Sequence, residues 1–395
     1  MNTALGSTSK TPAHAHASGA RRPVVVILTD IDFWQQTYGS HARIILTLKA
    51  IEEHCDLKVF CFRSVGQNVK AAFKALGLQA ELVSYKVYEK TAPAVPVGRG
   101  GHRELRSFYK HSWVAAAADY LERTRPDFVL IEYIDRSYLL DAVPEGTMTI
   151  LDTHDVMSHR AMAFQHYGRS VRLQFSAAQE AEILRMYDSI LAISQADCET
   201  FKTRLGMRNV IYAPHTVLLA ERTVRERDGR RLIFTGSDAE ANVIGLLWFL
   251  DQVWPMLEDH FVLDVVGKVS NAVAEAPKNV NLHGRVDSLD AYYEAADIAI
   301  NPVFVGGGIK IKTLDAMRYG VPCVTTAEGA RGLEDAVGKG LFLVGSRGEF
   351  VQTMLDLAVQ PDVRRRAEID AQTYVATRHA PEVAFRDLIM FLKNA

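Results

Sequence analysis

The sequence predicts an α/β protein made of two tandem, doubly wound domains, each built on a parallel sheet. Short runs of Val, Ile and Leu alternate with longer amphipathic segments over residues 23–215, and the same alternation begins again at residue 231. Strands that consist of continuous apolar runs are typical of parallel sheets covered by helices on both faces. A length of 395 residues is also that of two medium-sized domains.

The first predicted domain spans residues 23–215. The expected strands are 23–29, 57–62, 80–87, 127–133 and 147–152, and the expected helices are 41–54, 68–76, 104–124, 171–187 and 195–205. Helix 41–54, for example, carries apolar residues at helical spacing, with Ile44, Ile45, Leu48 and Ile51 on one face.

Polar segments separate the predicted domains from the rest of the chain. Residues 1–22 are rich in Ser, Thr, Ala and His and lack the apolar stretch of a secretory signal, so we expect a disordered tail. Residues 216–230 carry many charges and no apolar periodicity, and we place the linker there. The second domain follows over 231–380, with strands at 231–236, 261–267 and 298–302 and helices at 242–257 and 289–296. Residues 381–395 predict a final amphipathic helix.

The composition excludes several classes of protein. Forty-five Lys and Arg residues against 47 Asp and Glu residues give a formal net charge of -2, so no general attraction for nucleic acid is expected. The apolar run 113–118 is far too short to span a membrane. The four cysteines show no CxxC spacing, which indicates reduced thiols and a cytoplasmic location.

A glycine-rich segment near residue 307 is the most informative part of the sequence. Gly306, Gly307 and Gly308 follow a strand and precede a helix, where free backbone N–H groups and the helix dipole favour an anion such as a diphosphate. Lys310 and Lys312 in the first helical turn oppose that dipole unless an anion binds there. The alternative is a plain tight turn in which Lys312 pairs with Asp315.

This segment resembles the donor site of family 4 glycosyltransferases, which have the GT-B fold of two Rossmann-like domains with a cleft between them. The matching residues are Gly306, Gly308, Lys312, Leu314, Ala316, Met317, Gly320, Pro322, Val324 and Thr326. Three regions before this segment match as well. They are Phe234 to Ser237, which contains Gly236; the residues Trp248, Trp254 and Pro255; and Tyr292 to Asp297. The resemblance covers most of residues 231–335, and it implies that the last helix crosses back to the first domain. In the first domain, residues 188–194 resemble a strand of the same family.

The resemblance implies a nucleotide-sugar donor on the second domain, an acceptor on the first, and no metal or other cofactor. Asp315 matches the second acid of a pair and would accept hydrogen bonds from the ribose, while Lys312 matches the basic residue near the diphosphate. Gly236, Gly306, Gly307 and Gly308 belong to the expected donor site. The first acid of the pair would stand at position 307, where this sequence has glycine, and the usual Arg and Lys after the first strand of the domain are missing.

Candidate residues of the first domain lie at strand ends and in one basic loop. His154 and Asp155 follow strand 147–152, where open α/β sheets bind ligands, and Arg160 comes shortly after. The resemblance implies that His154 contacts the donor sugar and that Gly39 faces the diphosphate. A structural histidine, a helix cap at Asp155 and a plain turn at Gly39 are the alternatives.

The basic loop that begins at Gly98 contains Arg99 and Arg103 and lies close in sequence to Phe108 and Trp113. This combination fits an anionic or lipid-linked acceptor, or peripheral contact with the inner membrane. Its alternative is a solvated helix start. We expect Asp155 and Arg160 to contribute to the acceptor site as well.

The resemblance, taken with these residues, implies a retaining glycosyltransferase that moves a hexose from a nucleotide sugar to an acceptor. The acceptor would be a glycan, a lipid-linked or a small molecule in surface polysaccharide or glycoconjugate synthesis. His154, Lys312 and Lys310 are the expected catalytic residues. In the implied reaction the leaving diphosphate takes the acceptor proton, and the two lysines stabilise its charge. A catalytically silent sugar-nucleotide binding subunit and a GT-B epimerase are the alternatives, the first because of Gly307.

Overall fold

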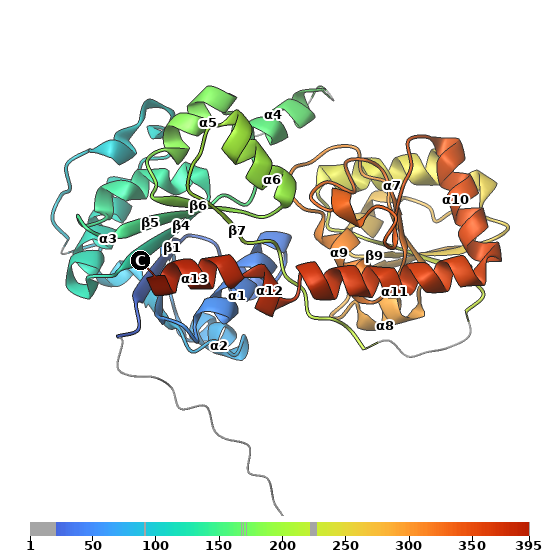
Figure 1. Ribbon diagram of the computed structural model, residues 1–395, viewed down its shortest axis with the longest axis horizontal. Coiled ribbons are helices and arrows are strands. Elements are labelled where there is room, and N and C mark those ends of the chain that lie inside the picture. Colours follow the sequence, from blue (N-terminus) through green and yellow to red (C-terminus); the bar gives the residue numbers. More distant parts are fainter. Residues whose placement is uncertain are drawn as a thin grey trace, which may run out of the picture.

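The computed structural model describes residues 21–90, 92–166, 168, 170, 172–221 and 227–394, and it confirms two doubly wound parallel-sheet domains. Figure 1 shows the two domains side by side, with helices on both faces of each sheet. The first sheet has the strand order β3-β2-β1-β4-β5-β6-β7 and the second the order β10-β9-β8-β11-β12-β13. Every strand pair is parallel.

The N-terminal domain contains seven strands and the helices that cover them. Its strands are β1 Val24–Thr29, β2 Asp56–Cys61, β3 Glu81–Ser84, β4 Phe128–Glu132, β5 Met148–Asp152, β6 Ser189–Ala192 and β7 Val210–Tyr212. Its α-helices are α1 Gly39–Ile51, α2 Gln67–Ala75, α3 His111–Thr124, α4 Met157–His166, α5 Ala177–Leu184 and α6 Gln195–Glu199.

The C-terminal domain repeats this arrangement. Its strands are β8 Arg231–Thr235, β9 Val262–Val266, β10 Val280–Gly284, β11 Ile298–Asn301, β12 Cys323–Thr325 and β13 Leu341–Leu343. Its helices are α7 Glu240–Gln252, α8 Asp290–Ala295, α9 Ile311–Arg318, α10 Arg347–Val359 and α11 Pro361–Arg378, followed by α12 Pro381–Ala384 and α13 Arg386–Asn394. Strands β7, β10 and β13 and helices α4, α10 and α11 were not among the predicted elements.

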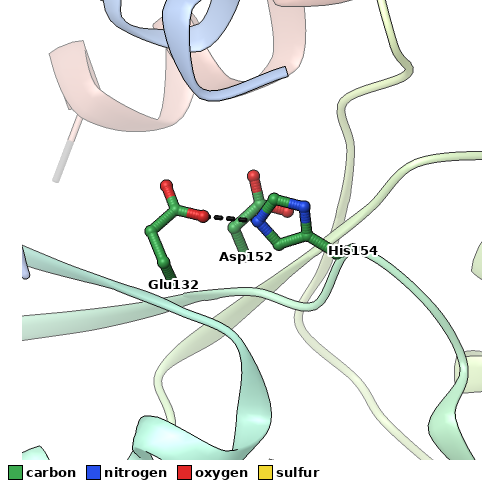
Figure 2. Close-up of side chains that lie close together, drawn as sticks. All are labelled: Glu132, Asp152 and His154. Atoms are coloured by element: carbon green, nitrogen blue, oxygen red, sulfur yellow. Dashed lines mark hydrogen bonds and ion pairs between the residues drawn. The ribbon is translucent and has the colours of Figure 1, made fainter. Parts of the chain in front are cut away.

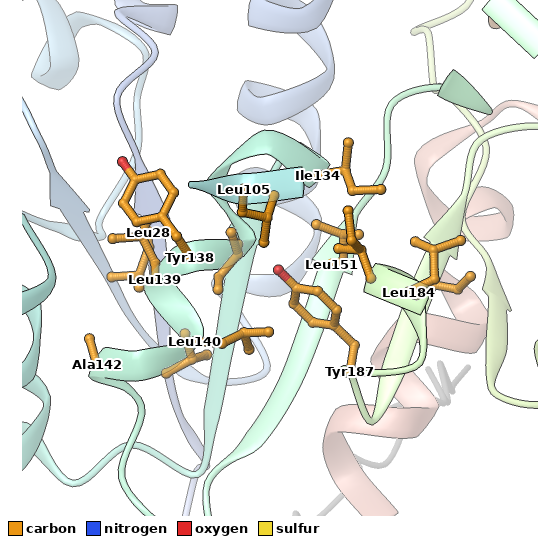
Figure 3. Close-up of a cluster of buried hydrophobic side chains, with 14 of the residues drawn as sticks. Leu28, Leu105, Ile134, Tyr138, Leu139, Leu140, Ala142, Leu151, Leu184 and Tyr187 are labelled. Carbon is orange, nitrogen blue, oxygen red and sulfur yellow. The ribbon is translucent and has the colours of Figure 1, made fainter. Parts of the chain in front are cut away.

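Two predicted helices begin later than expected. The expected helix 104–124 starts only at His111, because Lys110 is extended and residues 103–105 form a separate 3-10 turn that buries Leu105 in the core. The expected helix 171–187 starts at Ala177, where Ser176 and Gln179 form a capping box. Figure 3 shows Leu105 and Tyr187 in the same buried cluster as Leu28 and Leu151.

The last helices return to the N-terminal domain, as Figure 1 shows for α13. Phe385, Leu388 and Leu392 are buried in one cluster with Val25 and Ile27 of β1. Residues 1–20 of the predicted tail lie outside the described residues, but Arg21 and Arg22 are held to the domain by Asp127 at 2.6 Å and by the carbonyl of Cys55 at 2.6 Å. Of the predicted linker, residues 222–226 lie outside the described part.

Strand order determines where a ligand can bind. The chain winds outward in both directions from β1 and β4 in the first sheet and from β8 and β11 in the second. Crevices open beyond the carboxyl ends of strands at such switch points. The loops that follow these four strands are therefore the places to look for a site.

Candidate functional site

A cavity of about 680 Å³ lies between the two domains. The N-terminal domain contributes residues 35–39, between β1 and α1, and the C-terminal domain contributes the loops after β8, β9 and β10 and the start of α9. Five of the predicted residues line it, namely Gly39, Gly236, Lys310, Lys312 and Asp315. Sequence positions from both domains thus meet in one cavity at the ends of the parallel strands.

The glycine loop before α9 needs its glycines. Gly306 and Gly308 have φ values of 148° and 59°, which side chains rarely allow. Gly307 has no such constraint, but a Cβ atom there would lie 2.0 Å from Oδ2 of Asp155. The loop therefore packs against the N-terminal domain through backbone atoms.

Lys310 holds this loop in place. Its ammonium group lies 2.8 Å from Oε1 of Glu328 and donates a hydrogen bond to the carbonyl of Gly307 at 2.9 Å. Burial lowers the pKa of Lys310, and Glu328 opposes that shift. The charge of Lys310 is thus already paired within its own domain.

Lys312 is placed differently. It donates a hydrogen bond to Oδ1 of Asn242, and its ammonium group lies 4.5 Å from the centre of the Phe234 ring. Within the described residues no carboxylate lies within 4.0 Å of it, and burial together with Lys310 lowers the pKa of Lys312 to about 7. A partly buried cation that lacks a carboxylate partner is well suited to bind an anion.

Asp315 forms its ion pair with Arg318, one turn further along α9, and not with Lys312. Its Oδ1 accepts a hydrogen bond from Nε of Arg318 at 3.1 Å, so the alternative Lys312–Asp315 pair is not formed. Burial raises the pKa of Asp315, and Arg318 opposes that shift. The carboxylate remains on the wall of the cavity.

His154 turns its ring into the N-terminal domain. Its φ is 56°, and its imidazole stacks on the Tyr133 ring with centroids 4.0 Å apart. As Figure 2 shows, Nε2 of His154 meets Oε2 of Glu132, at 2.5 Å. The His154 side chain is not among those lining the 680 Å³ cavity, so its contact with a donor sugar stays a prediction.

A second polar group lies beside this pair. Arg43 of α1 forms a bidentate ion pair with Asp152 at the end of β5, with distances of 2.9–3.0 Å, and both side chains are buried. Ligand atoms of Glu132, Asp152 and His154 lie within 4.8 Å of one another, which suits a metal ion by distance. However, both oxygens of Asp152 already accept hydrogen bonds from Arg43. We therefore base no metal site on this cluster.

Glu132 and Arg43 were not among the candidate functional residues predicted from the sequence. Glu132 is the last residue of a predicted apolar strand, and Arg43 lies among apolar helix residues, so no local motif distinguishes them. A buried charge in an otherwise apolar segment was the only available signal.

The remaining predicted residues lie outside the 680 Å³ cavity. Arg160 lies 3.8 Å from Asp155, while Arg99 donates to the carbonyl of Met186 at 3.1 Å and Arg103 lies 3.5 Å from Glu182. The structure therefore places the two loop arginines beside α5 rather than beside Trp113. In the described ranges, we find no helix both long enough and apolar enough to cross a bilayer.

Comparisons with known proteins bear on the C-terminal domain and on the fold of the whole chain. Residues 229–360 match the family described as Glycosyl transferases group 1. The fold resembles that of TarM, with a TM-score of 0.73 at 10% identity over 94% of this chain and 99% of TarM; another TarM structure, from S. aureus, is similar. It also resembles HepE of Anabaena, in complex with UDP and glucose, with a TM-score of 0.65 at 14% identity over 94% of this chain and all of HepE.

The fold is thus that of GT-B proteins, and the similarity to group 1 glycosyl transferases is confined to residues 229–360 of the C-terminal domain. One curated relative, an uncharacterized 44.6 kDa protein in the cps region of Klebsiella pneumoniae, is 22% identical over 222 residues. That match takes in 52% of this chain and 56% of the relative, so the chain spans about half the length of the curated protein that it matches.

Proposed function

We propose that the protein is a retaining glycosyltransferase of family 4, which transfers a hexose from a nucleotide sugar to a glycan or lipid-linked acceptor. The observation that carries the proposal is Lys312. It lies in the interdomain cavity, in the first turn of α9, with the glycine loop directly before it and no carboxylate within ion-pair distance among the described residues. Such a cation is stabilised by a diphosphate.

The proposed reaction is a displacement on one face of the sugar. The acceptor hydroxyl oxygen forms a bond to the anomeric carbon, the bond from that carbon to the diphosphate oxygen breaks, and the leaving oxygen takes the acceptor proton. Lys312 and the loop amides stabilise the charge that grows on the diphosphate. Lys310 acts on this charge mainly by fixing the loop, since Glu328 already pairs with it. Asp315 accepts hydrogen bonds from the ribose hydroxyls.

The solved neighbours and the relative support the substrate classes. HepE structures are in complex with UDP, with UDP and glucose, and with UDP-glucose, and a TarM variant is in complex with UDP and alpha-GlcNAc-glycerol. The Klebsiella relative lies in a cps region, which fits a role in surface polysaccharide synthesis. We propose that no metal is required, because lysine and backbone amides already supply the positive charge at the diphosphate.

A thermal-shift panel of UDP-glucose, UDP-N-acetylglucosamine, GDP-mannose and ADP-glucose tests the proposal. A donor present at 100 times its Kd should add about 2.7 kcal/mol to the free energy of unfolding. Asp315→Ala should weaken that binding by about tenfold or more, whereas Glu240→Ala, at the exposed start of α7, should leave it unchanged. Failure of every sugar nucleotide to bind would refute the proposal.

A catalytically silent sugar-nucleotide binding subunit is the second candidate. The lack of an acidic side chain at Gly307 favours it. Slow hydrolysis of the bound donor distinguishes the two, since a transferase releases sugar to water at a measurable rate and a silent subunit does not.

A further inference from the structure

A contact across the cleft joins Asp155 of the N-terminal domain to Gly307 of the C-terminal domain. A Cβ atom added at Gly307 would lie 2.0 Å from Oδ2 of Asp155 and 2.7 Å from its Cγ and Oδ1. The three atoms nearest to that position all belong to the one carboxyl group. The carboxyl group of Asp155 thus fills the space that a side chain at position 307 would need.

This carboxyl group is buried but has few partners. Asp155 is 5% exposed, and its ion pair within the described residues is with Arg160, at the long distance of 3.8 Å. Burial raises the pKa of Asp155 to about 7. A buried carboxylate normally accepts several hydrogen bonds, and an incompletely bonded one is costly unless a ligand or water supplies donors.

The glycine loop that faces Asp155 is held in place by residues of the C-terminal domain. Lys310 bonds to the carbonyls of Gly307 and Gly308 at 2.9 and 3.3 Å, and Glu328 holds Lys310 in turn. The sequence segment that this loop resembles carries an acid at the position of Gly307. Here a carboxyl group reaches the same position from the other domain.

We propose that Asp155 provides, across the cleft, the carboxylate that binds hydroxyl groups of the donor sugar. This inference rests on the proposed function, because the sugar must be attached to a diphosphate held by Lys312 and the loop. A sugar hydroxyl can donate to either oxygen of Asp155, and a charge-assisted hydrogen bond of this kind is a strong one. The donor would then bind residues of both domains at once and favour their closed arrangement.

Binding measurements on Asp155→Asn test the proposal, since this variant keeps the shape of the side chain and removes its charge. The probes are the sugar nucleotide that stabilises the parent most in the panel above and the matching nucleoside diphosphate. We expect the affinity for the sugar nucleotide to fall tenfold or more and that for the nucleoside diphosphate to change less than twofold. Asp197→Asn is the matched control, because Asp197 is a half-buried acid whose charge also acts on Asp155.

The outcomes separate this inference from the proposed function. If the parent binds no sugar nucleotide, the proposed function fails. If the parent binds one and Asp155→Asn binds it equally well, only the role of Asp155 fails. A tighter affinity of Asp155→Asn for the nucleoside diphosphate would show that the carboxyl group competes with the diphosphate, and this result would also overturn the inference.

A second pair of variants excludes a merely space-filling role. Gly307→Ala should displace the carboxyl group of Asp155 and cause the same selective loss of sugar-nucleotide affinity, and thermal unfolding checks that it folds. In Asp155→Ala/Gly307→Ala the added methyl group has room. If Asp155 only fills space, the double variant recovers the parent affinity; if Asp155 binds the sugar, the loss of tenfold or more persists.

Discussion

Nε2 of His154 and Oε2 of Glu132 lie 2.5 Å apart, and both side chains are buried at the ends of neighbouring strands. Burial raises the pKa of Glu132, and His154 opposes that shift. The other oxygen of Glu132 has no hydrogen-bond partner in the described part of the structure. Glu132 thus orients the ring of His154, a residue that the sequence predicts to be catalytic.

We predict that Glu132→Gln and His154→Ala both lower transfer by about tenfold or more while the affinity for the nucleoside diphosphate stays unchanged. Glu132→Gln should also shift the pH profile of kcat, because Gln cannot hold a proton for the pair. Steady-state kinetics and calorimetry measure these quantities. Glu180→Gln is the control, since Glu180 is a buried acid that accepts hydrogen bonds from the backbone N–H groups of Met157 and Ser158. Equal losses of transfer and nucleotide binding would indicate a structural histidine.

Binding of a diphosphate should depend on pH through Lys312. The pKa of Lys312 is lowered to about 7, so the free protein loses this proton as the pH rises through 7, whereas the diphosphate favours the ammonium form. The affinity for the sugar nucleotide should therefore fall by up to about tenfold per pH unit above 7, with proton uptake on binding. Calorimetry in buffers of different ionisation enthalpy measures both.

Lys312→Met should lose this pH dependence and bind the diphosphate about tenfold or more weakly. Between pH 7 and 10.5 the unfolded chain holds more of this proton than the folded one, so the stability of the parent should rise with pH in that window more than that of the variant. Lys268→Met is the control, because Lys268 lines the same cavity but is 40% exposed. The same pH slope in the parent and in Lys312→Met would contradict the assignment.

Arg43→Met should destabilise the protein by about 3–5 kcal/mol, because Asp152 would remain buried without its partner. In the parent, burial favours a higher pKa for Asp152, but Arg43 and His154 outweigh it and lower the pKa. The stability from this pair is present above the ordinary pKa of an aspartate and is lost as the pH falls through the lowered value. Urea unfolding between pH 3 and 7 measures this pH dependence of the free energy of unfolding. If the destabilisation of Arg43→Met comes from the unpaired charge of Asp152, the double variant Arg43→Met/Asp152→Leu should recover most of the lost stability at pH 7.

Contact with an anionic membrane remains a proposal that depends on the basic loop. Arg99, Arg103 and Arg106 are exposed, although Glu182 offsets part of their charge. Changing all three to Ser should reduce co-sedimentation with anionic vesicles, since each basic residue contributes about 1 kcal/mol. Neutral vesicles and a variant with Arg347, Arg365 and Arg366 changed to Ser are the controls. Equal binding of the parent to both kinds of vesicle would remove the membrane proposal.

The sequence by itself determined the two parallel sheets and the glycine-rich segment before α9. Short apolar runs rich in Val and Ile, such as 24–28, favour buried strands. The three glycines, Lys312 and Asp315 lie within a few residues of one another, so local spacing defines that segment. The start of α3 at His111 was not predictable in the same way, because Leu105 is drawn into the core by contacts with distant strands.

Only the tertiary structure decided which charges meet. Arg43 and Asp152 are 109 residues apart, and Asp155 and Gly307 belong to different domains, so no spacing in the sequence relates them. Lys310 and Lys312 look alike in the sequence, yet Glu328 pairs with Lys310, whereas no carboxylate among the described residues pairs with Lys312. These differences arise because burial and charge pairing depend on how the strand ends and the two domains pack, and local sequence does not encode that packing.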